Sequence, residues 1–305
     1  MALIKSEKIK ALDTTIKLNF NEGLKMPVDE TYKRFTMEIP SDSSSNTYEW
    51  LSEFPLAQEW KGARKLRDVS MRTYEVDNKD WESSIKVHEN DVMDNKLASK
   101  FIAAKGLGYS INEIVPRQAY LALKKGHETL CYDGQNFFDT DHPIFEKEDG
   151  TGSSTAYSNM DTGSEPAWYL LCTTHPILKP IFWQNRMEPR FMTNGQDAGQ
   201  SEAYFMNKEI KYGADRRGAS GYGYWQMAYR STEELNEENF NKAYAKMCSQ
   251  LGDGGIVLGI VPDLLVVPPT LRTKANKIVK ALQIEGTTNV NAGVVDVISS
   301  PYLAG

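Results

Sequence analysis

The sequence predicts an α+β protein in which helical and strand-rich segments follow one another without an internal repeat. Three observations support this class. Two segments with strand-like alternation lie before residue 90, a long apolar stripe at helical spacing follows, and the chain beyond Gly126 is aromatic and rich in strand formers. With 305 residues, the chain can form one large domain or two modest ones.

Residues 1–45 are polar and alternate only weakly, and they end in a serine-rich cluster that disfavours helix. We therefore expect an extended N-terminal arm over residues 1–45. Residues 46–57 then connect the arm to the body of the protein.

Residues 58–90 are expected to form a long hairpin. Residues 66–76 and 81–88 alternate like strands, and the polar segment 77–80 has the composition of a turn. Charge is unevenly distributed over this hairpin. The basic candidates for contact between copies are Lys61, Arg64, Lys65, Arg67 and Arg72, and the acidic candidates are Glu75, Asp77, Asp80 and Glu82. The charges either face solvent or join the basic strand of one copy to the acidic strand of another.

The clearest helix in the sequence follows this hairpin. Its apolar stripe steps by three and four residues, which places the stripe on one helical face. The stripe contains Leu97, Phe101, Ala104, Gly108, Ile111 and Val115. We interpret it as a core face, and we expect a second helix from Pro116 to Gly126. Gly106 and Gly108 suggest that another backbone packs closely against the first helix.

Strands are predicted over residues 168–172, 181–184, 203–212 and 222–229. Residues 213–221 are polar and glycine-rich, so we expect a loop whose Arg216 and Arg217 could contact phosphate or an acidic neighbour. A helix should follow Asn236, and a buried strand should span residues 264–267. Thr270 is expected to cap a helix that reaches Lys280, and residues 294–298 should form a last strand.

The composition excludes several classes of protein. A net charge of −6 gives no general affinity for nucleic acid, and no apolar run is long enough to cross a membrane. Cys131, Cys172 and Cys248 show neither a disulfide framework nor zinc-ligand spacing. We expect a soluble chain that stays in the cytoplasm unless it is assembled into something that leaves.

Residues 130–145 contain the sequence's strongest candidate for chemistry. Asp139, Asp141 and His142 could belong to a metal-dependent hydrolase, but Asp and His-Pro sequences also form turns, and we favour the turn. No recognised nucleophile motif or dinucleotide fingerprint occurs. We therefore predict no catalytic, metal-binding or cofactor-binding residues.

Several blocks in order resemble one known family, the major head subunits of Mu-like phages and prophages (the gpT family). The blocks are residues 46–51 with 54–55, 130–143 (LCYDGQNFFDTDHP), 166–171 with 178–180 and 184–186, 208–209 with 212–213, 223–229, 252–255 and 264–269. Together they cover nearly all of the chain from about residue 30 onward.

The resemblance implies the HK97-like tailed-phage major capsid fold. Residues 1–45 would be the N-terminal arm, 58–90 the extended loop, 91–129 the peripheral domain with its spine helix and a second helix, 130–260 the axial domain, and 261–305 a C-terminal segment that returns to the peripheral domain and the axial sheet. It also implies a virion protein that assembles with itself as hexamers and pentamers into an icosahedral shell enclosing DNA without sequence-specific binding. A separate scaffold, a maturation protease, a portal protein and a decoration protein would be its partners. The alternative with the same fold is the shell of a cellular nanocompartment.

Overall fold

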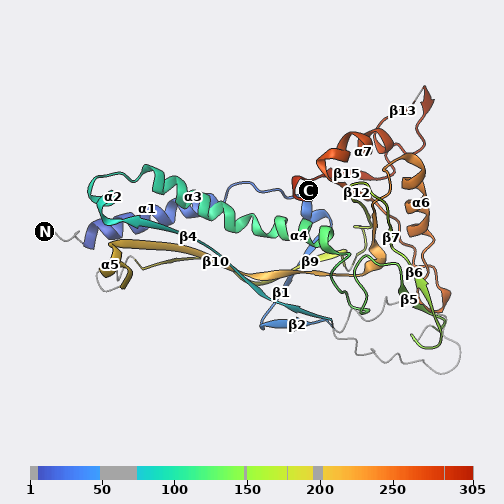
Figure 1. Ribbon diagram of the computed structural model, residues 1–305, viewed down its shortest axis with the longest axis horizontal. Helices are drawn as coiled ribbons and strands as arrows, with labels where there is room; N and C mark the ends of the chain where they lie inside the picture. The colour runs from blue at the N-terminus through green and yellow to red at the C-terminus, as the bar shows by residue number, and fades with distance from the viewer. Residues whose placement is uncertain are drawn as a thin grey trace.

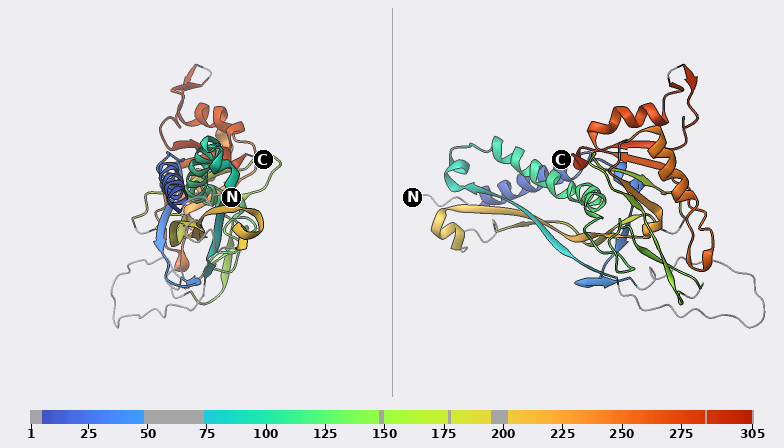
Figure 2. Two further views of the ribbon diagram at one scale, coloured as in Figure 1. Left: turned by 90° about the vertical axis from the view of Figure 1, so that its left-hand side faces the viewer. Right: turned by 45° about the vertical axis from the view of Figure 1, so that its right-hand side comes forward.

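The computed structural model describes residues 6–48, 74–147, 150–176, 178–194, 202–284 and 286–304. Figure 1 shows an elongated region on the left and a compact region on the right. The elongated region consists of α1 (Ser6–Leu24), β1 (Thr36–Pro40), β4 (Lys79–His88), α2 (Glu89–Met93), α3 (Ala98–Asn112), α4 (Ile114–Lys125), β9 (Ile181–Thr193), α5 (Glu202–Asn207) and β10 (Glu209–Tyr222). Figure 2 shows that the molecule is narrow when it is viewed along its long axis.

The elongated region is built on a four-stranded sheet with the order β1-β9-β10-β4. β10 pairs antiparallel with both β9 and β4, whereas β1 pairs parallel with β9. Helices α1, α3 and α4 contact the sheet, and apolar side chains of β4 and β10 such as Val87 and Ile210 pack beneath them. The alternate positions of β4, β10 and the outer half of β9 point to the other face. They carry Asp80, Glu82, Lys86, Arg190, Lys211, Asp215 and Arg217.

The prediction of an extended arm over residues 1–45 is wrong for its first half. Residues 6–24 form the 19-residue helix α1, and only β1 and β2 (Ser45–Thr47) are extended in the second half. Leu12, Ile16 and Phe20 are buried at helical spacing, which a mainly polar composition conceals. Such a helix forms because α3 and the sheet cover its narrow apolar stripe.

Two glycines allow α1 and α3 to pack closely. A Cβ atom on Gly108 would lie 2.1 Å from the carbonyl oxygen of Phe20, and one on Gly23 would lie 2.0 Å from that of Lys105. The predicted close approach is therefore confirmed at Gly108. It is wrong at Gly106, where an added Cβ would meet nothing within 4 Å.

The predicted stripe of the spine helix is divided between two helices. α3 ends at Asn112 and α4 begins at Ile114, so Val115 lies in α4, before Pro116. Ala104, Ile111 and Val115 are buried, whereas Leu97 and Phe101 are half-buried and pack against the core between α1, α3 and the sheet.

The predicted pairing of residues 66–76 with residues 81–88 is wrong for its described part, residues 74–76. β3 (Glu75–Asp77) pairs with β2, and β4 pairs with β10 along its full length. Alternation identified both strands, but it carries no information about their partners. Residues 49–73 are outside the described part of the chain, and the predicted contact residues Lys61, Arg64, Lys65, Arg67 and Arg72 lie among them.

The predicted glycine-rich loop over residues 213–221 is also wrong, because these residues belong to the long strand β10. Its glycines make room for aromatic rings of β9. A Cβ on Gly218 would lie 2.6 Å from the Trp183 ring, and one on Gly221 would lie 2.3 Å from the Phe182 ring. A strand is predicted over residues 203–212, but residues 203–207 belong to the helix α5.

The compact region is built on a five-stranded sheet with the order β15-β12-β8-β11-β7. Its strands are β7 (Met160–Asp161), β8 (Trp168–Leu171), β11 (Ala228–Ser231), β12 (Leu264–Val267) and β15 (Asp296–Ser299). It also contains the pairs β5 (His142–Phe145) with β6 (Ser154–Tyr157) and β13 (Gln283–Ile284) with β14 (Thr287–Thr288), and the helices α6 (Glu237–Cys248) and α7 (Arg272–Val279). The short 3-10 helices in the described residues are η1 (Thr31–Arg34), η4 (Trp225–Met227), η5 (Asp253–Gly255), η6 (Pro269–Leu271) and η7 (Pro301–Leu303).

Most predicted elements of the compact region are confirmed. Every residue of β8 and β12 is buried, and the side chain of Asn236 caps α6 by accepting a hydrogen bond from the Asn239 amide at 2.9 Å. Thr270 does not cap α7, because it lies within η6 and Leu271 occupies the cap position.

The C-terminal residues pack against α4. The Tyr302 hydroxyl donates to the Glu113 carboxylate at 2.8 Å, and the Lys124 ammonium donates to the Ala304 carbonyl at 3.2 Å. No helix in the described ranges is long and apolar enough to cross a membrane.

Candidate functional site

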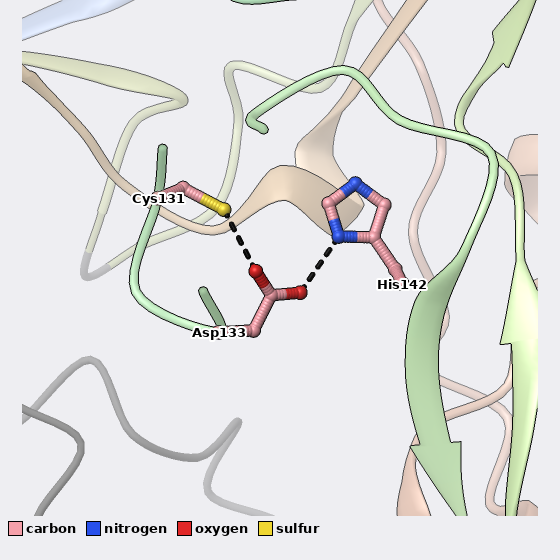
Figure 3. Close-up of side chains that lie close together, drawn as sticks. All are labelled: Cys131, Asp133 and His142. Carbon is pink, nitrogen blue, oxygen red and sulfur yellow. Dashed lines mark hydrogen bonds and ion pairs between the residues drawn. The ribbon is translucent and has the colours of Figure 1, made fainter. Parts of the chain in front are cut away.

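The connection between α4 and β5 folds back on itself and brings polar side chains together. The Cys131 amide donates to the Gln135 carbonyl at 2.8 Å, and the Gly134 amide donates to the Cys131 carbonyl at 3.1 Å. Gly134 adopts a φ of 87°, which favours glycine. This turn places Cys131 and Asp133 beside His142, the first residue of β5 (Figure 3).

Asp133 lies at the centre of this polar cluster, which we define as Cys131, Asp133 and His142. Its carboxylate accepts from the Cys131 thiol at 3.1 Å and lies 2.7 Å from the Nδ1 of His142 (Figure 3). The imidazole stacks on the Trp225 ring, with the ring centroids 4.0 Å apart and an angle of 8° between the planes. The side chain of His142 is fully buried and that of Asp133 is 4% exposed.

The electrostatics of the cluster do not favour nucleophilic catalysis. Burial, reinforced by the charge of Asp133, raises the pKa of the Cys131 thiol well above its ordinary value. Burial would also raise the pKa of Asp133, but the hydrogen bond and charge of His142 outweigh this effect and lower it. Cys131 and His142 both bond to Asp133, so the imidazole is not placed as the base of a thiolate nucleophile.

In the predicted rival set of Asp139, Asp141 and His142, the two carboxyl groups interact with each other, and their hydrogen bond raises the pKa of Asp141. The Nδ1 of His142 contacts Asp133 instead of either of them. Asp139 accepts from the Asn136 amide at 3.1 Å and the Thr140 amide at 2.7 Å, as expected for a turn. Asp141 is exposed. Within the described ranges, the group of possible metal ligands that includes His142 contains Cys131 and Asp133 instead. The sequence signal that could have found them is Cys131-x-Asp133 in the same block as His142.

A groove of about 950 Å³ runs beside the cluster. It is lined by the segment from Tyr74 to Trp81, one side of α4, the turn that contains Cys131 and Asp133, and the end of β10. The carboxylates of Glu75 and Asp77 and the ammonium groups of Lys79 and Lys125 give this groove a mixed charge.

The described acidic candidates for contact between copies lie on β3 and β4. Glu75 and Asp77 are exposed on β3. On β4, the Asp80 carboxylate contacts the Nε of Arg217 at 3.2 Å, and Glu82 accepts from the Ser84 hydroxyl at 2.8 Å. Asp80 therefore has a partner within its own chain.

Arg216 differs from Arg217 because it lies on the helix-covered side of β10. It is 6% exposed, its guanidinium lies 5.4 Å from the centroid of the Trp183 ring, and its charge is 3.8 Å from the Glu188 carboxylate. Burial lowers the pKa of Arg216 below its ordinary value. This position does not fit a predicted exposed loop that binds phosphate.

Comparison with known proteins identifies the family. The model of the family described as "Mu-like prophage major head subunit gpT" matches residues 9–303. The chain belongs to the Mu-like prophage major head subunit family. It is 33% identical to the major capsid protein of Escherichia phage Mu, over 99% of this chain and 100% of that protein. It is 35% identical to the Mu-like prophage FluMu major head subunit of Haemophilus influenzae, over 92% of this chain and 91% of that subunit.

Solved capsid structures resemble the subunit over most of its length. The procapsid of bacteriophage JBD30 matches with a TM-score of 0.81 and 39% identity, over 96% of this chain and 98% of that one. The JBD30 capsid matches with a TM-score of 0.74 and 32% identity, over 92% of each chain. The subunit therefore has the HK97-like capsid fold, and it is a structural component of the virion and not an enzyme.

Proposed function

We propose that the subunit assembles as hexamers and pentamers into an icosahedral shell that encloses packaged DNA. The observation that carries this proposal is its similarity to the JBD30 procapsid subunit over 96% of the chain. Many modest contacts spread over a large surface allow one chain to occupy both kinds of ring. A net charge of −6 suits a container that encloses DNA without binding its phosphate backbone tightly.

The domain assignment is part of the proposal. Residues 1–45 form the arm, 46–57 the connection, 58–90 the extended loop, 91–129 the peripheral domain, 130–260 the axial domain and 261–305 the returning C-terminal segment. The contacts of Tyr302 and Ala304 with α4 support a C-terminal segment that returns to the peripheral domain. Within the proposed extended loop, residues 79–88 are β4 and pair with β10 of the elongated sheet.

The proposed partners are other copies of the subunit, a separate scaffold, a maturation protease, a portal protein and a decoration protein. A solved JBD30 capsid is decorated with minor capsid protein trimers, and this supports the decoration protein.

Electron microscopy of the purified subunit tests the proposal. Size-exclusion chromatography and negative-stain images should be recorded over a range of salt and protein concentrations, with and without a co-expressed scaffold. Closed shells containing five-fold and six-fold rings are expected. A subunit that stays monomeric under all these conditions, including with scaffold, would contradict the proposal.

We also propose that basic residues of the extended loop in one copy contact acidic residues of the loop in another copy. Charge reversal tests this contact. Arg64→Glu with Arg67→Glu, and separately Glu75→Lys with Asp77→Lys, should lower the yield of particles, because each places like charges at the proposed contact. Combining all four changes should restore part of the yield. Reversal of Glu237 and Glu238, exposed acids of α6, is the control. Normal particle yield from both double variants would exclude this contact.

A further inference from the structure

The polar cluster contains three side chains that zinc binds in proteins. One atom from each of Cys131, Asp133 and His142 lies within 4.8 Å of the other two. A thiolate, a carboxylate and an imidazole are all zinc ligands, and the thiolate and imidazole disfavour magnesium and calcium. These residues come from a tight turn and from the start of β5, eleven positions apart in the chain, so the fold is what brings them together.

We propose that Cys131 Sγ, the Asp133 carboxylate and His142 Nδ1 bind one zinc ion. Zinc lies about 2.3 Å from sulfur and about 2.0 to 2.2 Å from nitrogen or oxygen, so ligand atoms around a tetrahedral ion lie roughly 3.3 to 3.8 Å apart. In the structure, Asp133 is 3.1 Å from the thiol and 2.7 Å from the imidazole. Admitting the ion therefore requires a movement of the Asp133 carboxylate by about 1 Å and an approach of Sγ and Nδ1, which lie within 4.8 Å of each other.

The surroundings of the cluster hold its ligands in place. The Gln135 amide donates to Asp133 Oδ1 at 3.0 Å, and the Trp225 ring fixes the plane of the imidazole. Such neighbours orient ligands and reduce the cost of ordering them around a metal.

The neighbouring groove provides the route of entry. Cys131 and Asp133 both line it, so an ion can reach the cluster from solvent, and water can complete the coordination as a fourth ligand. Three protein ligands and one water make a site that binds more weakly than a closed site with four protein ligands.

Binding rearranges two protons. The Cys131 thiol releases its proton to solvent and becomes a thiolate. The proton that His142 Nδ1 donates to the Asp133 carboxylate must also leave Nδ1, and the bound imidazole then carries one proton, on Nε2. Nε2 is buried without a hydrogen-bond partner, which further limits the affinity. The ion replaces the contacts of Asp133 with Cys131 and His142 by three metal bonds that join the turn to β5.

Metal content and thiol protection of the full-length protein test the proposal. Wild-type protein loaded with zinc and then desalted should retain about one ion per subunit by mass spectrometry. In apo protein titrated with cobalt as a probe, a thiolate-to-cobalt charge-transfer band should appear. Cys131→Ser and Asp133→Asn should each weaken zinc binding at least about tenfold, since loss of even a supporting residue costs this much.

Two control variants test whether zinc binding depends on the polar cluster. Cys172→Ser removes another buried thiol and Asp141→Asn removes the exposed carboxylate beside His142, so both should bind zinc like the wild type. Zinc should also slow alkylation of Cys131 in the wild type, a readout that needs no variant. Zinc content below about one tenth of an ion per subunit, equal binding by Cys131→Ser, or unchanged alkylation would each overturn the proposal.

Discussion

The two sheets of the subunit differ in how they are buried. In the compact region, every residue of β8 and β12 is inaccessible to solvent, as expected for strands covered on both faces. In the elongated region, β4 and the outer half of β9 alternate between half-buried and exposed residues. The sheet of the compact region mainly stabilises the fold, whereas the sheet of the elongated region exposes a long polar face.

Truncation of one large side chain in each sheet should reveal this difference most strongly. Leu265→Ala in β12 should lower the free energy of unfolding by about 2 to 5 kcal/mol, because it leaves a cavity in a fully buried strand. Met192→Ala in β9 should change it by about 0.5 kcal/mol or less, because Met192 is 44% exposed. Urea unfolding of unassembled subunits, followed by tryptophan fluorescence, measures both. Similar losses for the two variants would contradict the difference between the sheets.

Substitution of two neighbouring glycines should have opposite effects on α3. Gly108→Ala should destabilise the subunit by about 1 to 3 kcal/mol, because its Cβ would collide with the backbone of α1. Gly106→Ala should stabilise it by about 0.5 to 1 kcal/mol, because alanine favours helix and nothing lies within 4 Å. Thermal unfolding of both variants shows whether each substitution stabilises or destabilises the subunit. Stabilisation by both would mean that α1 does not lie against Gly108 in solution.

The burial difference also explains which parts of the fold could be predicted. The strands of the compact region are short apolar runs, such as the four residues of β12, and α6 carries both an apolar stripe and an asparagine cap. These local signals are sufficient to predict the positions of these strands and of α6. The partners of β3 and β4 were not predictable, because alternation identifies a strand but not its neighbour.

The glycines of β10 show why the sequence predicts a loop where the structure has a strand. Gly218 and Gly221 indicated a loop, although they lie in β10 and accommodate the rings of Trp183 and Phe182 on β9. A glycine that makes room for a ring and a glycine in a turn look alike in a sequence, since only the neighbouring strand distinguishes them. Likewise, the sequence indicates His142 as a candidate, but its partners Cys131 and Asp133 are brought beside it only by the fold of the turn.

The docking of α1 on the elongated sheet should weaken as the pH rises. The Tyr212 hydroxyl donates to Asp13 at 2.7 Å, and burial raises the pKa of this carboxyl above its ordinary value. The protonated form is therefore favoured in the folded state. Its contribution to stability is complete below the pKa of the unfolded chain, about 3.9, and is lost as the pH rises through the higher folded pKa.

Hydrogen exchange of the α1 amides, corrected for intrinsic rates, can measure this effect. Protection should be greater at pH 4.5 than at pH 7, and Asp13→Asn should remove the difference while it retains the contact with Tyr212. Glu7→Gln, an exposed carboxylate on the same helix, should leave the pH dependence unchanged. Equal protection at the two pH values in the wild type would show that Asp13 does not control the docking.

The smallest effect on subunit stability is expected on the polar face of the elongated sheet. Arg217 and Asp80 form an ion pair across β10 and β4, and the Asp80 side chain is 79% exposed. Asp80→Asn should lower the free energy of unfolding by about 0.5 kcal/mol or less, because solvent screens such a pair. If Asp80 also contacts a neighbouring subunit, the same variant should reduce particle yield in electron micrographs far more than this loss of stability explains. A yield that follows subunit stability alone would assign Asp80 to the internal ion pair and remove it from the candidate contacts between copies.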